Sequence, residues 1–178
     1  PVMQSEDLVQ LAKQTTFMMD HGNLDIEITT DLPNHPVEIE CDRGQIGQAL
    51  TNVIKNASEA LSDQNDASIN VKLIDDDNEV LIIISDNGKG LPENMIHTLT
   101  EPYVTTRSKG TGLGLAIVKK IMKDHGGALN LENNKGEGAS VSLIFKKDSS
   151  QSEDDDQQSD ELDEEVIVES KLRIIHGA

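Results

Sequence analysis

Two kinds of apolar spacing alternate along this chain, and their order most limits how it can fold. Short segments alternate apolar and polar residues, the period of a half-buried strand, whereas longer segments have the spacing of an amphipathic helix. The expected strands, in chain order, are residues 23–31, 37–41, 68–74, 79–84, 128–132 and 139–145. Helical spacing covers residues 44–61 and 112–127. This order predicts an α/β fold, a two-layer sandwich of a mixed β-sheet with helices on one face.

The first 20 residues also have helical spacing and predict a short N-terminal helix. Ser5 is the expected capping residue, because its hydroxyl can accept a hydrogen bond from the first turn. Glu6 and Asp7 follow it, and acidic residues favour the positive end of a helix dipole. The sequence therefore predicts that this helix begins near Ser5.

Other local signals mark the ends of the remaining helices. Asp42 precedes residues 44–61 and is the expected cap of that helix, while Gly126–Gly127 are expected to end the helix over 112–127. Residues 91–111 show little periodicity beyond one turn. A loop of this length in a compact domain is typical of a functional segment.

The net charge of −18 is unevenly distributed. Residues 148–165 hold ten acidic residues and no basic one. Because such a composition buries little apolar surface, residues 148–178 are expected to form an acidic, disordered tail. Solvation is its default role, with competition for a phosphate site and docking elsewhere as the alternatives. A chain this acidic is not expected to bind nucleic acid through bulk electrostatics.

Two further observations indicate whether this chain crosses a membrane and in which redox compartment it lies. No stretch approaches the roughly 18 apolar residues of a membrane-spanning helix, and no secretory signal opens the chain. No direct membrane contact is therefore expected for this fragment. The chain begins with Pro1, as a piece of a longer protein would, so an anchor elsewhere stays open. The single cysteine, Cys41, excludes an internal disulfide and is expected to be a plain thiol in a reducing compartment.

Two asparagines stand four residues apart on the helix over 44–61. Asn52 and Asn56 therefore lie on one side of it, at the edge of its apolar stripe. Ordinary polar packing at a core boundary is one explanation. The other is metal binding, because a carboxamide oxygen can coordinate Mg²⁺ without adding charge to a site that holds phosphate oxygens.

The strand over 79–84 is followed by the sequence SDNGKG, in which Asp86 precedes Gly88 and Gly90. A carboxylate beside residues without side chains leaves room for a planar ring against the backbone. The same carboxylate can accept a hydrogen bond from an exocyclic amine of that ring. The alternative is a simple turn, since DNGKG is also a good turn sequence.

The sequence KGTGLGLAIV leads from a glycine-rich loop into a helix. Free N–H groups and the positive end of the helix dipole make such a junction a phosphate site. It is not a dinucleotide fingerprint, because Leu115 stands where the third glycine would be, and it lacks the Gly-Lys-Ser/Thr of a Walker loop. Arg107 and Lys109 add positive charge just upstream. A flexible hinge is the alternative.

In this order and spacing, the three motifs resemble the catalytic and ATP-binding domain of sensor histidine kinases, within the ATPase superfamily that includes gyrase. NVIKNASEAL is similar to the N box, SDNGKGLP to the G1 box and KGTGLGLAIV to the G2 box. Residues 101–127 are most similar to the NtrY-like nitrogen-regulation kinases. The resemblance implies a Bergerat-type fold, ATP and Mg²⁺ as cofactors, and a catalytic domain over residues 21–147. Residues 1–20 would be a linker or a helix remnant of a dimerisation domain.

The resemblance also implies roles for individual residues. Asn56 resembles the Mg²⁺-coordinating amide, with Asn52 supporting phosphate or metal, and Asp86 resembles the adenine-reading carboxylate, with Gly88 and Gly90 making room for the ring. Arg107 and Lys109 are the implied γ-phosphate contacts. The remaining implied nucleotide contacts, all in the phosphate turn or in an ATP lid over residues 92–110, are Tyr103, Thr105, Thr106, Gly110, Thr111, Gly112, Leu113, Gly114 and Leu115.

One position departs from the family pattern, and a second separates this chain from the ATP-hydrolysing members of the superfamily. Ala139 stands where many relatives carry a hydroxyl beside the adenine-reading Asp, and Ser140 would face the other way in a regular strand. Asn52 stands where ATP-hydrolysing relatives have a Glu that activates water, and an amide cannot act as a general base. The resemblance therefore favours phosphoryl transfer to a protein side chain over hydrolysis, by positioning and charge neutralisation.

The implied partners are a histidine-bearing dimerisation domain of the parent protein and the receiver domain of a response regulator. None of the five histidines of this chain stands in the sequence context of the family's acceptor, so the acceptor lies elsewhere. A cytoplasmic location follows from the resemblance, with an inner-membrane anchor in the parent protein left open. Two alternatives remain, a non-catalytic nucleotide-sensing module and a serine kinase of the anti-sigma type.

Overall fold

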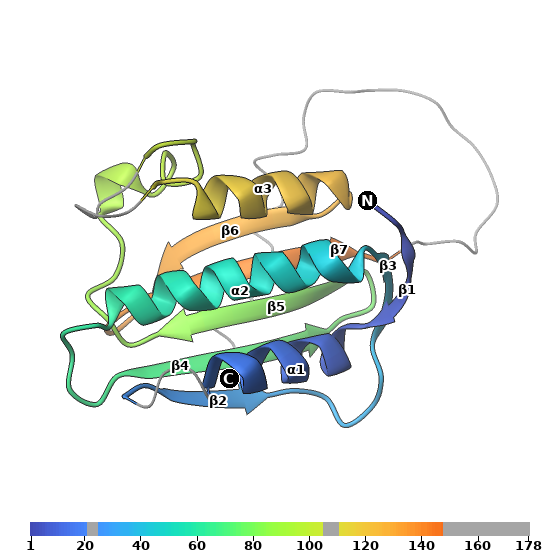
Figure 1. The fold of residues 1–178 in the computed structure, drawn as a ribbon, viewed down its shortest axis with the longest axis horizontal. Coiled ribbons are helices and arrows are strands. Elements are labelled where there is room, and N and C mark those ends of the chain that lie inside the picture. The colour runs from blue at the N-terminus through green and yellow to red at the C-terminus, as the bar shows by residue number, and fades with distance from the viewer. Residues whose placement is uncertain (21–24, 105–110, 148–178) are drawn as a thin grey trace. The chain divides into compact units, whose positions relative to one another are not determined.

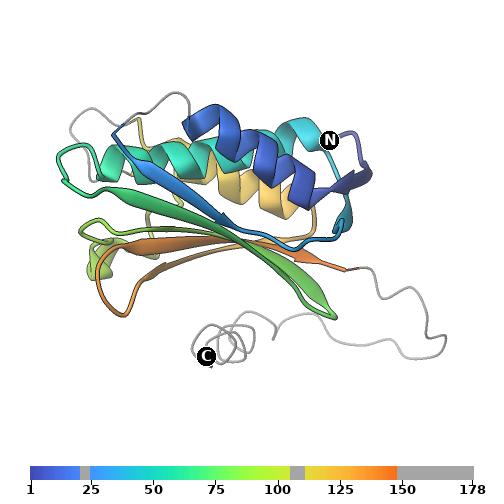
Figure 2. The same cartoon turned by 90° about the horizontal axis from the view of Figure 1, so that it is seen from below.

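The computed structural model describes residues 1–20, 25–104 and 111–147. Its main sheet has five strands in the order β2-β4-β5-β7-β6, and helices cover one face of it (Figures 1 and 2). β2 runs parallel to β4, and the other neighbours are antiparallel, so the sheet is mixed as predicted. The strands are β2 (Glu27–Asp31), β4 (Ser68–Asp75), β5 (Glu79–Asp86), β6 (Ala128–Asn133) and β7 (Ala139–Lys146).

Three helices lie on this face, α1 (Leu8–Asp20), α2 (Arg43–Ala60) and α3 (Gly114–Asp124). Their apolar stripes pack on the strands to form the main core, which explains why helical and alternating spacing alternate along the sequence. The helical side chains in this core include Leu8, Leu11, Ile46, Leu50, Val53, Ile54, Val118, Ile121 and Met122.

β5 is the middle strand of the sheet, and both of its faces are buried. Val80, Ile82 and Ile84 belong to the main core beneath the helices. Leu81 and Ile83 alternate with them and form a second, smaller cluster on the other face. The nearly continuous apolar sequence of this strand follows from burial on both sides.

The predicted ends of α2 and α3 are confirmed. Asp42 is the N-cap of α2, and its carboxylate accepts the Gln45 N–H at 3.0 Å. Gly126, at φ +65°, follows the end of α3; its N–H donates to the Lys123 carbonyl, and the Gly127 N–H donates to that of Met122. These two bonds form a Schellman motif, in which the positive φ requires glycine.

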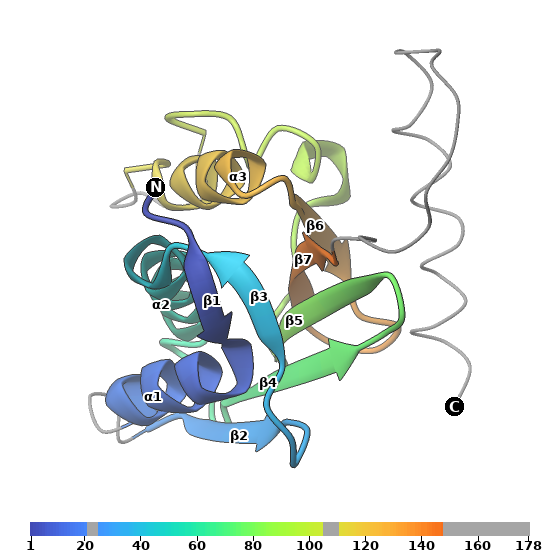
Figure 3. The same ribbon diagram turned by 90° about the vertical axis from the view of Figure 1, so that its right-hand side faces the viewer.

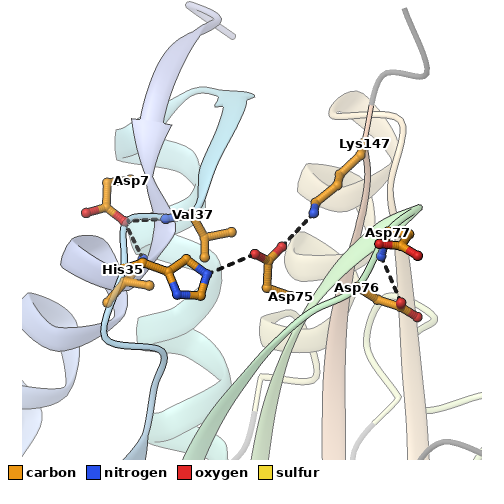
Figure 4. Close-up of polar contacts among 8 residues, drawn as sticks. Asp7, His35, Val37, Asp75, Asp76, Asp77 and Lys147 are labelled. Carbon is orange, nitrogen blue, oxygen red and sulfur yellow. Dashed lines mark hydrogen bonds and ion pairs between the residues drawn. The ribbon is translucent and has the colours of Figure 1, made fainter. Parts of the chain in front are cut away.

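The N-terminal prediction was wrong at its start. Residues 4–7 form a strand, β1 (Gln4–Asp7), antiparallel to β3 (Glu38–Cys41) in a separate two-stranded sheet (Figure 3). Ser5 does not cap a helix; its hydroxyl donates to Glu38. Asp7 caps α1 instead, because its carboxylate accepts the Val9 N–H at 2.9 Å and also the Val37 N–H at 3.1 Å (Figure 4).

The structure bears on two further predictions, which concern the Cys41 thiol and a membrane-spanning helix. Cys41 is fully buried, and burial, with smaller contributions from neighbouring acids, raises the pKa of its thiol to about 11. It is therefore a poor nucleophile at neutral pH. Among the residues that the structure describes, no helix is both long and apolar enough to cross a membrane.

Asp75, at the end of β4, joins two other parts of the chain (Figure 4). Its carboxylate contacts Lys147 Nζ at 2.7 Å, just after β7, and His35 Nε2 at 3.2 Å, in the loop before β3. The hydrogen bond from Lys147, helped by His35, holds the pKa of Asp75 below its ordinary value of 3.8. The ionised form of Asp75 therefore stabilises the fold.

We expect Asp75→Asn to lower the free energy of unfolding at pH 7 by about 1 kcal/mol or less, because the ion pair is partly exposed. A lowered pKa in the folded state stabilises the protein above the ordinary value of 3.8, and this stabilisation is lost as the pH falls through the folded-state value. The difference between variant and wild type should therefore shrink as the pH falls below 3.8. Urea unfolding from pH 7 to pH 3 measures it, with the exposed Asp77→Asn as the control. A difference that is as large at pH 3 as at pH 7 would contradict the ionic explanation.

Candidate functional site

A cavity of about 710 Å³ lies where α2, α3, β5 and the β6–β7 pair meet the segment between β5 and α3. Its size suits a ligand of a few hundred daltons. Apolar side chains form one part of the lining, namely Val53, Ala57, Ile84, Leu91, Leu99, Val104, Leu131, Ala139 and Val141. The remaining lining includes the amides, the carboxylate and the glycine-rich turn that the sequence analysis selected.

Asp86 ends β5 and lines the apolar part of the cavity. Its Oδ1 accepts the Gly88 N–H at 2.9 Å and the Ala139 N–H at 3.3 Å. Because both bonds use one oxygen, Oδ2 can accept a hydrogen bond from a ligand. The carboxylate is thus fixed in orientation by two backbone amides.

The departure at Ala139 has a structural counterpart. Ala139 lines the cavity, whereas the Ser140 hydroxyl bonds Asn134 Oδ1 and the Ser85 hydroxyl, both at 2.6 Å. Ser140 therefore does not face the cavity, as the alternation of β7 predicted. In place of a side-chain hydroxyl, the backbone N–H of Ala139 contacts Asp86 directly.

The two glycines after Asp86 both leave room for protein atoms. A Cβ at Gly88 would lie 3.0 Å from Asp86 Oδ1 and 3.2 Å from a Leu61 methyl. A Cβ at Gly90, which has φ +76°, would lie 2.8 Å from Asn133 Oδ1. Gly90 lines the cavity, and the structure gives Gly88 a part in holding Asp86.

Asn52 and Asn56 both line the cavity from α2. Asn56 lies against the first turn of α3, since a Cβ at Gly114 would be 3.3 Å from Asn56 Nδ2. The N-cap of α3 is Leu113, whose side chain has no hydrogen-bond acceptor. Leu113 thus gives the first turn of α3 no side-chain cap, in contrast to Asp42 in α2. A helix start of this kind can bind an anion, and the Asn56 amide stands beside it.

The segment before α3 meets the glycine-rich turn through its backbone. The Tyr103 N–H donates to the Gly112 carbonyl at 3.0 Å, and a Cβ at Gly112, which has φ +66°, would lie 2.6 Å from the Tyr103 carbonyl carbon. Thr111, Gly112, Leu113, Gly114 and Leu115 all line the cavity. The Tyr103 side chain is 79% exposed and is not brought to the cavity. Five predicted contacts, Thr105, Thr106, Arg107, Lys109 and Gly110, lie outside the described residues.

Two residues that support this site were not selected from the sequence. Asn133 is the last residue of β6 and Asn134 follows it, and both contact the backbone of the Asp86–Leu91 turn. In the sequence, NNKGEG stands between the expected strands over 128–132 and 139–145, and no site residue was predicted in it. The one signal in the sequence was the pair of adjacent asparagines. Their contact with the Asp86–Leu91 turn can be predicted only when the order of the strands in the sheet is known.

A match to a protein family identifies the family of this chain. Residues 41–149, more than half of the chain, match the family described as histidine kinase-, DNA gyrase B- and HSP90-like ATPases. The chain belongs to this ATPase family. All three predicted motifs, and thus Asn56, Asp86 and Gly114, lie within the matched region of the ATPase domain.

The curated relatives of this ATPase domain include a nitrogen regulation protein and putative sensor histidine kinases. It is 40% identical to the nitrogen regulation protein NtrY of Azorhizobium caulinodans over 88% of this chain and 21% of NtrY. It is also 40% identical to a putative NtrY-like sensor histidine kinase of Rickettsia prowazekii, over 82% of this chain and 24% of that protein. The chain thus spans about a fifth to a quarter of the length of these relatives.

Solved structures of histidine kinases share this fold. The catalytic domain of histidine kinase ThkA is 28% identical, with a TM-score of 0.74, 82% of this chain and 97% of that domain being covered. ThkA in complex with the response regulator protein TrrA is 25% identical, with a TM-score of 0.71, and the match covers 82% of this chain and 42% of that ThkA chain. Full-length ShkA in complex with AMPPNP is 26% identical, with a TM-score of 0.68, and the match covers 80% of this chain and 30% of ShkA. The fold prediction is therefore confirmed.

Proposed function

We propose that this ATPase domain binds ATP with Mg²⁺ and transfers the γ-phosphoryl group to a histidine on a separate dimerisation domain of its parent protein. A response regulator would then receive the phosphoryl group. The observation that carries the proposal is the meeting of Asp86, Asn56 and the uncapped start of α3 in one cavity. The names of the curated relatives and of the ThkA complex give it further support.

The residues present fit ATP and Mg²⁺. The apolar lining around Asp86 suits a flat base, and the first turn of α3 suits phosphate oxygens. Among the described residues, no group of three or more His, Cys, Asp or Glu side chains could hold a metal. The metal would thus be held by the Asn56 amide oxygen together with phosphate oxygens and water. Mg²⁺ in proteins usually takes few side-chain ligands and several ligands from substrate phosphates and water. When bound, Mg²⁺ would neutralise charge on the transferring phosphoryl group.

The chain's own residues would position the nucleotide and supply charge. Asp86 Oδ2 accepts a hydrogen bond from the base, the apolar lining excludes water, and the α3 amides bind phosphate oxygens. Arg107 and Lys109 are proposed to contact the γ-phosphate. Asn52 cannot take a proton from water, so transfer to the acceptor imidazole is favoured over hydrolysis. In that step a histidine nitrogen forms the new N–P bond while the bond to the ADP leaving group breaks.

The test is phosphoryl transfer from γ-labelled ATP to the dimerisation domain of an NtrY-like kinase, supplied in trans. We expect label on that domain that is lost in acid and kept in alkali, the stability of phosphohistidine. Nucleotide binding without any labelled acceptor would instead support a nucleotide-sensing module. Acid-stable label would support a serine kinase. Either result contradicts the histidine kinase proposal.

A second prediction separates the metal role of Asn56 from base recognition. We expect Asn56→Ala to bind ATP like the wild type in EDTA, but to lose about tenfold in affinity when Mg²⁺ is present. Phosphoryl transfer should fall at least about 100-fold, because charge neutralisation is the main catalytic contribution. Isothermal titration with and without Mg²⁺ measures the first effect, with Asn78→Ala, at the far end of β5, as the control. Equal losses in both buffers would contradict a metal-binding role.

The same proposal assigns a role to each part of this chain and a location to the domain. Residues 1–20 are proposed to continue from the dimerisation domain, 21–147 to be the catalytic domain and 148–178 to be an acidic tail. α1 nevertheless contributes Leu8 and Leu11 to the main core. We place the domain in the cytoplasm, where ATP and a response regulator are present, with any membrane anchor elsewhere in the parent protein.

A further inference from the structure

The turn that follows β5 is held at both ends by two adjacent asparagines from the β6–β7 hairpin. Asn134 Nδ2 donates to the Asp86 carbonyl oxygen at 3.0 Å. Asn133 binds Leu91 twice, since Oδ1 accepts the Leu91 N–H at 2.6 Å and Nδ2 donates to the Leu91 carbonyl at 2.9 Å. The backbone from Asp86 to Leu91 is thereby tied to a different pair of strands.

Asn134 is itself fixed by its neighbours. Its Oδ1 accepts the Ser140 hydroxyl at 2.6 Å, its Nδ2 also reaches the Glu137 carbonyl at 3.2 Å, and its N–H donates to the Gly138 carbonyl. Because Ser140 donates its proton to Asn134, the Ser85 hydroxyl must be the donor in the 2.6 Å contact with Ser140. A chain of hydrogen bonds thus runs from Ser85 through Ser140 and Asn134 back to Asp86.

The same hairpin also reaches the carboxylate and the peptide of Asp86. The Ala139 N–H contacts Asp86 Oδ1, and Gly138, at φ +89°, lies so close that a Cβ there would overlap the Asp86 carbonyl oxygen. A side chain that reads a base must be held within about 0.5 Å of its productive position. The position of Asp86 therefore depends on the hairpin as well as on β5.

We infer that Asn133, Asn134 and Ser140, here called the hairpin clamp, are positioning residues that give this site its preference for adenine over guanine. The inference rests on the proposed function, in which Asp86 reads the base. Adenine presents an amine donor at its position 6, whereas guanine presents a carbonyl oxygen there. A fixed carboxylate accepts from the amine and repels the carbonyl oxygen. A carboxylate that can shift loses much of this discrimination.

The dissociation constants of ATP and GTP test the inference. Asn134→Asp keeps the size of the side chain and the acceptor for Ser140, but it places an oxygen against the Asp86 carbonyl. We expect its ATP affinity to fall about tenfold with little change for GTP, so the ATP:GTP preference also falls about tenfold. Asn78→Asp makes the same chemical change at the other end of β5 and should leave both constants unchanged.

Thermal unfolding shows whether each variant is folded. If Asn134→Asp does not fold, Ser140→Ala decides. It leaves Asn134 in place and removes the hydroxyl that orients it, together with the contact of that hydroxyl with Ser85. A severalfold loss of preference is expected. An unchanged preference, or equal losses for ATP and GTP, overturns the inference. Asp86→Asn distinguishes a failure of the clamp inference from a failure of the proposed base-reading role of Asp86. If Asp86→Asn loses the preference and the clamp variants keep it, only the clamp inference fails; if Asp86→Asn also keeps it, the proposed base-reading role fails.

Discussion

Asp86→Asn is expected to weaken ATP binding about 100-fold, in the presence and in the absence of Mg²⁺. The substituted amide can still accept the Gly88 and Ala139 N–H groups through its oxygen. Its NH₂ group then faces the amine of the base, so an attractive contact becomes a repulsive one. A loss that is independent of metal distinguishes this residue from Asn56, whose variant should bind like the wild type in EDTA.

Isothermal titration with ATP measures the effect, and Asp77→Asn serves as the matched control. Asp77 is exposed in the turn between β4 and β5, so the same charge change there should alter affinity less than about twofold. If Asp86→Asn bound ATP as well as the control did, Asp86 would have no part in base recognition. The proposal would then lose the carboxylate on which it depends.

Gly138→Ala is expected to destabilise the fold by about 3 kcal/mol and to abolish measurable ATP binding. A Cβ at Gly138 would overlap the Asp86 carbonyl oxygen and lie 2.6 Å from its carbonyl carbon and 2.9 Å from Asn87 Cα. Its φ of +89° is also one that residues with a Cβ avoid. Both effects push the start of β7 away from Asp86 and the cavity that Asp86 lines.

Gly136→Ala is the control for this prediction, because it adds the same methyl group to the same hairpin. A Cβ at Gly136 would meet nothing within 4 Å, so we expect a change within about 0.5 kcal/mol. Urea unfolding of the two variants makes the comparison. Similar stabilities for both would show that close approach at Gly138 does not hold the hairpin against β5.

Much of this fold could be predicted because its helices and strands are long and strongly periodic. α2 and β5 were predicted within one or two residues of their observed ends. The N-terminus was not, because Ser5, Glu6 and Asp7 carry the local signals of a helix start. What decides their structure is pairing of β1 with β3, more than 30 positions away in the chain. Local spacing holds no information about such a partner.

The residues of the site also fall into a group that could be predicted from the sequence and a group that could not. Asp86, Asn56 and the turn at Gly112 could be selected because each lies in a short motif with its own chemistry. Asn133 and Asn134 could not, because their contacts with the Asp86–Leu91 turn depend on β7 lying between β5 and β6. Tyr103 was selected by resemblance, and its exposed side chain shows that a position in a motif does not fix the direction of a side chain.

The most direct test of the ATP site is a crystal structure of this domain with a non-hydrolysable ATP analogue and Mg²⁺. We expect the amine of the base within hydrogen-bond distance of Asp86 Oδ2. The phosphates should lie at the first turn of α3, with the metal bound to the Asn56 amide oxygen. An analogue bound with its base away from Asp86, or a metal that does not contact Asn56, would contradict this account.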